Sequence, residues 1–243
     1  MPDEKPTALL PPPEGQQYVI TRESLADGSL LARIRADAPA YLHFRSEAEL
    51  DAELATTMAE LAPGADLWLF GYGSLIWNPV IHFAERRAAR ITGYHRSYCI
   101  WLELGRGSPE HPGLMLALDE GGECGGVAYR IPAREAPAEM RLVWRREMAG
   151  GAYRPAWVTA ETAAGPLRAL TFIINHDFPR YVGALDEAEI AERVATASGM
   201  LGSCAAYLFD TIAALEALGL RDPMLDRIAA LVRARQDQPT ASP

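Results

Sequence analysis

Six short runs of apolar and β-branched residues, each bounded by glycine, proline or polar residues, occupy the middle of the chain. Runs of this kind are typical of β-strands. They are LWLF (67–70), ARITGYHRSYCIW (89–101), GLMLALD (113–119), GVAYRI (126–131), YRPAWVTAE (153–161) and LRALTFIIN (167–175). Because helical patterns do not alternate regularly with them, they predict one sheet or barrel rather than a βαβ architecture.

Helical patterns flank this strand-rich region and interrupt it once. Between the fourth and fifth runs, PAEMRLVWRREMAGG (137–151) carries apolar residues at helical spacing, and its final glycines provide a stop. Residues 21–61 and the chain after Asn175 show the same spacing. In the second of these regions, Asp186 and Glu189 predict a capping box, and Asp222 followed by Pro223 predicts the start of a further helix. The order of elements predicts an α+β fold.

Composition divides the chain into four parts. Residues 1–17 are rich in proline and polar residues and predict a flexible tail. A helical N-terminal extension is expected over 18–65, the main domain over 66–235, and a second flexible tail over 236–243.

Charge and cysteine usage narrow the class of partner. A net charge of -9 argues against broad adhesion to nucleic acid or an anionic membrane, and favours a small molecule as partner. The three cysteines are widely spaced and without a CxxC pair, which indicates reduced thiols in the cytoplasm. No apolar run approaches the ~20 residues of a transmembrane helix, and the N-terminus lacks the pattern of a secretory signal.

The sequence GYGSLI, Gly71 to Ile76, follows the first apolar run directly. Its glycines allow positive φ angles and a close approach of the backbone to a bound group. A dinucleotide fingerprint requires glycine where Ile76 stands, and a hydrolase nucleophile elbow around Ser74 requires glycine where Tyr72 stands. Taken alone, the motif remains open between a ligand cradle and a simple turn at the end of a strand.

Glu147 falls on the apolar side of the helix predicted within 137–151, since it lies seven residues after Met140 and three after Trp144. It also lies in the last turn, where the helix dipole disfavours a carboxylate. Both effects raise the pKa of Glu147 towards the range of a general base or acid near neutral pH. The alternative is a buried ion pair with an arginine, and Arg145 and Arg146 lie off the apolar side.

Other candidate groups carry less information. Tyr207 lies on the apolar side of a predicted helix, where a core tyrosine with one hydrogen bond is the simpler interpretation. The five histidines show no spacing typical of metal ligands, so no metal site is predicted.

Several longer motifs resemble one known family in the order in which they occur. FGYGSLIWNP, ITGYHRSYCIW, RGSPEHPGLMLALD, RREMAGGAYRP and ATASGMLGSCAAYLFDT are similar to the motifs of ChaC-type γ-glutamylcyclotransferases, over about residues 66–235. The resemblance implies a γ-glutamylcyclotransferase-like fold with a small β-barrel flanked by helices. It also implies the conversion of glutathione to 5-oxoproline and cysteinylglycine by intramolecular attack of the substrate's α-amine, without cofactor or metal.

By resemblance, the substrate loop falls on Gly71, Tyr72, Gly73, Ser74, Leu75 and Ile76. The catalytic glutamate falls on Glu147, a tyrosine lining the pocket on Tyr207, and a basic residue facing a substrate carboxylate on Arg106. Met148 stands where some members of the family, especially eukaryotic ones, have lysine, so the resemblance implies a bacterial origin. Two alternatives stay open, a cyclotransferase for another γ-glutamyl amine and a non-catalytic regulator of cation transport, and a monomer is expected.

Overall fold

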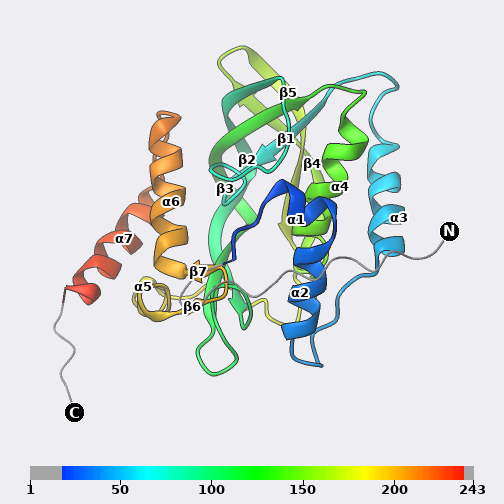
Figure 1. Cartoon of the computed structure of the whole chain (residues 1–243). Helices are drawn as coiled ribbons and strands as arrows, with labels where there is room; N and C mark the ends of the chain where they lie inside the picture. Colours follow the sequence, from blue (N-terminus) through cyan, green and yellow to red (C-terminus); the bar gives the residue numbers. More distant parts are fainter. Residues whose placement is uncertain (1–17, 238–243) are drawn as a thin grey trace.

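The computed structural model describes residues 18–237, and its centre is a closed five-stranded barrel (Figure 1). The strand order is β1-β3-β2-β4-β5, and parallel pairings of β5 with β1 and β3 close it. The strands are β1 (Leu67–Gly71), β2 (Glu85–Leu102), β3 (Gly113–Ile131), β4 (Tyr153–Thr162) and β5 (Gly165–Ile174). The predicted α+β class with a small barrel is therefore confirmed.

The third and fourth predicted strands are a single strand, which corrects the sequence interpretation. β3 continues through Gly121 and Gly122, whose φ angles are +92° and +68°, and β2 runs antiparallel beside its whole length. Opposite them the register of β2 shifts near Gly93, which also has a positive φ. The glycines bend the two-stranded ladder together, so they mark an irregularity within a strand rather than a turn between strands.

Helix α4 (Ala136–Glu147) connects β3 to β4 and packs its apolar side against the barrel. Met140, Val143 and Trp144 are at most 1 % exposed, and the Trp144 ring meets Phe172 of β5 edge-on at 5.5 Å. The helix ends at Glu147 with Met148 as its C-cap, ahead of the turn at Gly151 with φ +78°. This packing fixes the C-terminal end of α4 against the barrel wall.

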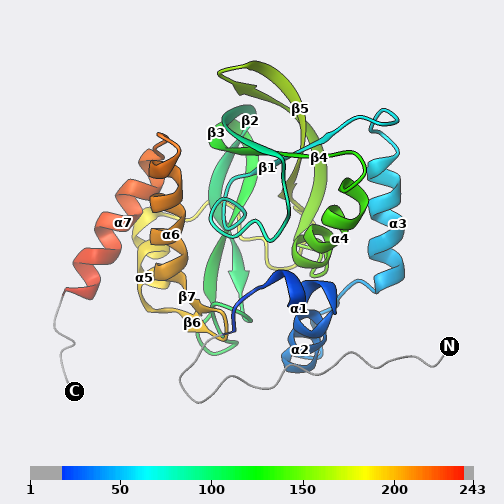
Figure 2. The same cartoon turned by 45° about the horizontal axis from the view of Figure 1, so that its top comes forward.

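The C-terminal helices cover the opposite side of the barrel from α3 and α4 (Figures 1 and 2). They are α5 (Glu187–Thr196), α6 (Cys204–Ala217) and α7 (Pro223–Gln236), with a two-stranded hairpin of β6 (Ser198–Gly199) and β7 (Gly202–Ser203) before α6. Asp186 accepts a hydrogen bond from the amide of Glu189, and Asp222 caps α7 with Pro223 in its first turn. Both predicted helix starts are observed, but the return bond from the Glu189 side chain that would complete the predicted capping box is not formed.

Three helices form the N-terminal extension: α1 (Arg22–Ala26), α2 (Ser29–Asp37) and α3 (Glu47–Met58). Gly28, with φ +74°, separates the first two. The extension is tied to α4, because the Arg22 guanidinium donates two hydrogen bonds to the buried carboxylate of Glu139, at 2.5 and 2.7 Å. In the part of the chain that the structure describes, no helix is long and apolar enough to cross a membrane.

Two sequence predictions concern chain ends. The proline-rich tail predicted for 1–17 lies outside the described residues. The tail predicted for 236–243 is described only at Gln236, the last residue of α7, and at Asp237, its C-cap.

Candidate active site

A cavity of about 920 Å³ lies between the barrel, the end of α4, the start of α6 and the N-terminal extension. This size is at the upper end of the range for small-molecule sites. Its wall includes Ser74, Arg106, Glu147 and Tyr207, four of the residues predicted from the sequence. The structure therefore brings Ser74, the helix carboxylate and the α6 tyrosine to one cavity, while the other five residues of the predicted loop, Gly71, Tyr72, Gly73, Leu75 and Ile76, are not part of its wall.

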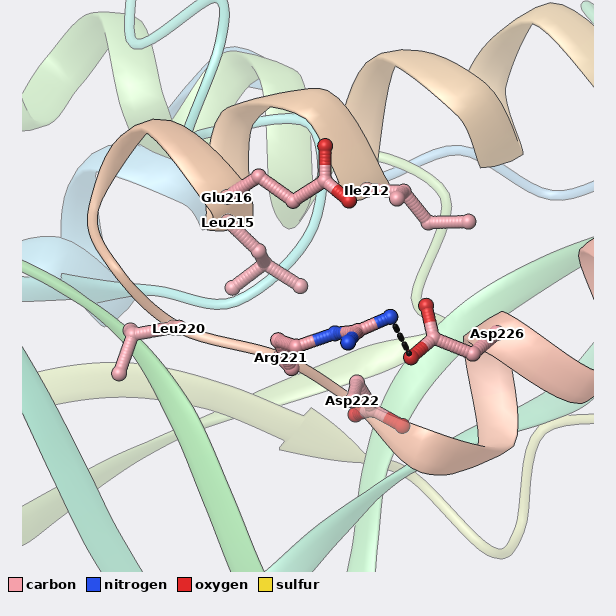
Figure 3. A pocket seen from close by; sticks show the side chains of 7 residues that line it. All are labelled: Ile212, Leu215, Glu216, Leu220, Arg221, Asp222 and Asp226. Carbon is pink, nitrogen blue, oxygen red and sulfur yellow. Dashed lines mark ion pairs between the residues drawn. The ribbon is translucent and has the colours of Figure 1, made fainter.

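A second hollow lies between α6 and the start of α7 (Figure 3). It encloses essentially no free volume, and the ion pair between Arg221 and Asp226, with its nitrogen and oxygen 3.1 Å apart, crosses it. Its wall consists of Ile212, Leu215, Glu216, Leu220, Arg221, Asp222 and Asp226. It has no room for a ligand.

Glu147 places its carboxylate at the wall of the large cavity. Its side chain is 14 % exposed, and its Oε1 atom is buried without a hydrogen-bond donor in the described residues. Burial raises the pKa of Glu147, and the positive charge of Arg146 opposes this increase only in part. A carboxyl group with a raised pKa can accept and return a proton near neutral pH.

Arg146 pairs with Glu147, although its position off the apolar side of the helix had argued against it as a partner. Its Nε lies 3.0 Å from Oε1 of Glu147, in an ion pair whose orientation does not make a hydrogen bond. Its Nη2 donates to the hydroxyl of Ser74 at 2.7 Å, and its Nη1 donates to the carbonyl of Asn78 at 2.5 Å. One guanidinium thus connects the helix carboxylate to the segment that contains the loop.

Three buried tyrosines lie near enough to Glu147 for its charge to affect their pKa values. The pKa values of Tyr72, Tyr153 and Tyr207 are raised, first by burial and then by the charge of Glu147 or of one another. Tyr153, which the sequence analysis missed, donates to the carbonyl of Leu116 at 3.0 Å. All three stay protonated near neutral pH and can act only as neutral donors or acceptors.

The two glycines of the loop serve close packing, and the expectation of positive φ is wrong for both. Neither Gly71 nor Gly73 has a positive φ. A Cβ on Gly71 would lie 2.9 Å from the Cβ of Leu75, and a Cβ on Gly73 would lie 2.7 Å from the hydroxyl of Tyr207. Side chains are excluded here because the loop folds back on itself and approaches α6.

Leu75 and Ile76 hold the loop against the main core. Both side chains are buried in the main core, and the hydroxyl of Tyr129 lies 3.0 Å from both carbonyl oxygens, which share its one proton. The amides of Gly73, Ser74 and Leu75 donate to no acceptor within residues 18–237. The loop is therefore held by its side chains and carbonyls, and of these three residues Ser74 lies in the wall of the cavity.

Arg106 provides a cation beside the cavity. Its guanidinium lies 5.4 Å from the ring centre of Tyr207 and 5.9 Å from that of Trp77, and Nη1 donates to the carbonyl of Ser203 at 2.9 Å. Burial lowers its pKa, Asp210 favours the charged form, and the described residues give it no ion-pair partner. The other cavity arginines are each paired with a carboxylate: Arg45 with Glu53, Arg145 with Glu47, Arg146 with Glu147 and Arg180 with Glu103.

Metal ligands are not grouped anywhere in residues 18–237. No cluster of three or more His, Cys, Asp or Glu side chains in this range could hold a metal ion.

The fold is that of γ-glutamylcyclotransferases. The crystal structure of the γ-glutamyl cyclotransferase specific to glutathione from yeast matches with a TM-score of 0.64, covering 70 % of this chain and 96 % of that chain. The two sequences are 22 % identical, so this likeness concerns the fold alone.

The chain belongs to the ChaC-like protein family, whose sequence profile matches residues 67–235. The glutathione-specific γ-glutamylcyclotransferase of Escherichia coli (strain K12) is 40 % identical over 183 residues, which are 75 % of this chain and 79 % of the relative. The Schizosaccharomyces pombe protein of the same name is 32 % identical over 173 residues, covering 63 % and 84 %. The resemblance seen in the motifs is thereby confirmed.

Proposed function

We propose that this protein is a glutathione-specific γ-glutamylcyclotransferase. The observation that supports the reaction best is the pairing of a buried carboxylate of raised pKa, Glu147, with a loop whose three amides lack an acceptor. The substrate specificity rests on membership of the ChaC-like family and on relatives named for this activity.

In the proposed reaction the α-amine of the γ-glutamyl group attacks its own γ-carbonyl. A new C–N bond closes the five-membered ring of 5-oxoproline, and the bond to the cysteinyl nitrogen breaks. Glu147 takes a proton from the attacking amine and delivers it to the leaving nitrogen, so cysteinylglycine departs as an amine. The amides of Gly73, Ser74 and Leu75 stabilise the negative charge on the γ-carbonyl oxygen.

The chain's own groups supply the positioning. Arg146 fixes Ser74 relative to Glu147, which keeps the loop and the base at a constant separation. The hydroxyl of Tyr207 packs against Gly73 and lines the cavity. A flexible peptide is thereby held in a bent pose, which removes much of the entropic barrier to ring closure.

The decisive experiment is incubation of the purified protein with glutathione, followed by detection of 5-oxoproline and cysteinylglycine. Parallel reactions with γ-glutamyl amino acids separate glutathione specificity from activity on other γ-glutamyl amines. Release of 5-oxoproline from no γ-glutamyl compound contradicts the proposed function and leaves a non-catalytic role.

We also propose a cytoplasmic, monomeric enzyme that uses no cofactor or metal and binds neither nucleic acid nor membrane. The three cysteines are buried and unpaired, as in reducing compartments. The net charge of -9 disfavours polyanionic partners. The mass of the purified protein in solution tests the monomer.

Arg106→Met is expected to raise KM for glutathione by about 10- to 100-fold with a smaller effect on kcat, because it removes a charged hydrogen-bond donor for a substrate carboxylate. Arg180→Met is the matched control, since Arg180 lines the same cavity but is paired with Glu103. Equal effects of the two substitutions on KM contradict a specific role for Arg106.

Arg146→Met is expected to move the acid limb of the kcat/KM profile to higher pH by about 1 unit or more, because the nearby cation lowers the pKa of Glu147. The base is active only when ionised, so a higher pKa delays the rise of activity with pH. Arg146→Lys keeps the charge and should leave the limb nearer its original position. An unmoved limb in Arg146→Met contradicts the coupling.

A further inference from the structure

Arg96 is a buried arginine on β2 for which the mechanism above has no role. Its side chain is only 1 % exposed, although the residue lies in the wall of the barrel opposite Leu118 of β3. Burying a guanidinium is costly unless its donors are matched by acceptors. The identity of those acceptors shows what the residue holds.

All three nitrogens of Arg96 have an acceptor, and each acceptor lies on a different element. Nε donates to the carbonyl of Tyr72 in the glycine loop at 2.8 Å, and Nη2 donates to the carbonyl of Gly125 in β3 at 2.6 Å. Nη1 donates to the carboxylate of Asp222, the N-cap of α7. One side chain thus ties the loop to the barrel wall and to a C-terminal helix.

The bond to Tyr72 sets the orientation of the next amide. The described residues contain no cis peptide bond, so the carbonyl of Tyr72 and the N–H of Gly73 belong to one trans unit and point in opposite directions. With the carbonyl turned towards Arg96, the Gly73 N–H faces away from it, and it has no acceptor within the described chain. A rotation of this peptide would break the hydrogen bond from Arg96 to the Tyr72 carbonyl and would turn the Gly73 N–H to a new direction at the same time.

We propose that Arg96 is a positioning residue that orients the Tyr72–Gly73 peptide, so that the Gly73 amide is held ready for the γ-carbonyl oxygen of the substrate. Asp222 supports it by fixing the guanidinium from α7. The catalytic part of this inference rests on the proposed cyclotransferase function, while the orientation of the peptide does not.

Arg96→Lys tests the proposal, because lysine keeps the charge but cannot reach three divergent acceptors in the same fixed geometry. Loss of one oriented donor to the oxyanion is expected to lower kcat for glutathione by about 100-fold, with KM changed much less. Asp222→Asn keeps a good helix cap and removes only the charge that holds Arg96, so a fall in kcat of about 10-fold is expected. Arg90→Lys, on the exposed side of the same strand, is the control.

The amide of Gly73 gives a readout that needs no catalysis. In protein labelled with ¹⁵N-glycine, its resonance should move in Arg96→Lys and in Asp222→Asn, and stay in place in Arg90→Lys. Near-normal kcat in folded Arg96→Lys, or an unmoved Gly73 resonance in Asp222→Asn, overturns the proposal. If the wild-type protein releases no 5-oxoproline, the proposed function fails, and the Gly73 resonance still decides whether Arg96 orients the peptide.

Discussion

Glu147→Gln is expected to lower the rate of 5-oxoproline formation by about 10²- to 10⁴-fold, the usual effect of losing a general base. Glutamine keeps the size and shape of the side chain but cannot take the proton of the attacking amine. Binding of glutathione should persist, because the loop amides and Arg106 are unchanged. Near-normal turnover in this variant contradicts the assigned role.

The free energy of unfolding of Glu147→Gln distinguishes a catalytic role of Glu147 from a structural one. The pKa of Glu147 is raised in the folded state, so the stability linked to its proton is present below the unfolded-state pKa and is lost as pH rises through the folded-state pKa. Glutamine does not ionise and avoids this loss. At neutral pH the free energy of unfolding of Glu147→Gln, measured with urea, should therefore equal or exceed that of the wild type.

Glu139→Gln is the matched control on the same helix. Burial raises the pKa of Glu139, but the hydrogen bonds and charge of Arg22 outweigh this effect and hold the pKa below its ordinary value. The ionised form of Glu139 therefore stabilises the fold above the unfolded-state pKa. This stabilisation is lost as pH falls through the folded-state pKa. Glu139→Gln should thus lower the free energy of unfolding at neutral pH and keep kcat, the opposite of Glu147→Gln. The same pattern in both variants would assign Glu147 a structural role.

Most of the fold was predictable because strands and helices leave local patterns in the sequence. The buried side of α4 follows from the spacing of Met140 and Trp144, and that spacing also identified Glu147. The break between two predicted strands at Gly121 and Gly122 was wrong, because a bulge and a turn use the same glycines. Only the partner strand distinguishes them, because β2 continues beside β3 on both sides of a register shift.

A site residue was predictable where the spacing within its own helix indicated a role, as for Glu147. It was not predictable where the role depends on contact with a distant segment. Counting along a helix places Arg146 off the apolar side, but the count does not include the loop that packs on the end of α4. Its guanidinium reaches Ser74 and Asn78 across that contact. Tyr153 was missed for the same reason, since its position in β4 says nothing about the carboxylate it lies near.

The role of the glycines in the loop also depends on a contact with a distant segment. A glycine in the sequence indicates that a side chain is excluded, but not what excludes it. The expected cause was a positive φ, whereas the observed cause at Gly73 is the hydroxyl of Tyr207, which belongs to a helix far along the chain. The prediction for this position therefore concerns a contact rather than a backbone conformation.

Gly73→Val is expected to reduce kcat/KM for glutathione by about 100-fold or more, because a misplacement of about 1 Å at the reacting group has this effect. Its Cβ would lie 2.7 Å from the hydroxyl of Tyr207, closer than real Cβ contacts allow. Tyr207 cannot easily move aside, since it is 5 % exposed and packs against both Trp77 and Arg106. Unchanged affinity and turnover for glutathione would contradict the loop as a substrate cradle.

A double-mutant cycle identifies the clash as the cause. Gly73→Ala adds only the Cβ, and Tyr207→Phe removes only the oxygen that this Cβ meets. If the two atoms interact as the structure indicates, the double variant should be more active than the product of the two single effects predicts. Strictly additive losses would mean that Gly73 is needed for space around the substrate itself. Recovery in the double variant would instead show that Tyr207 sets the position of the loop, and with it the distance from the loop amides to Glu147.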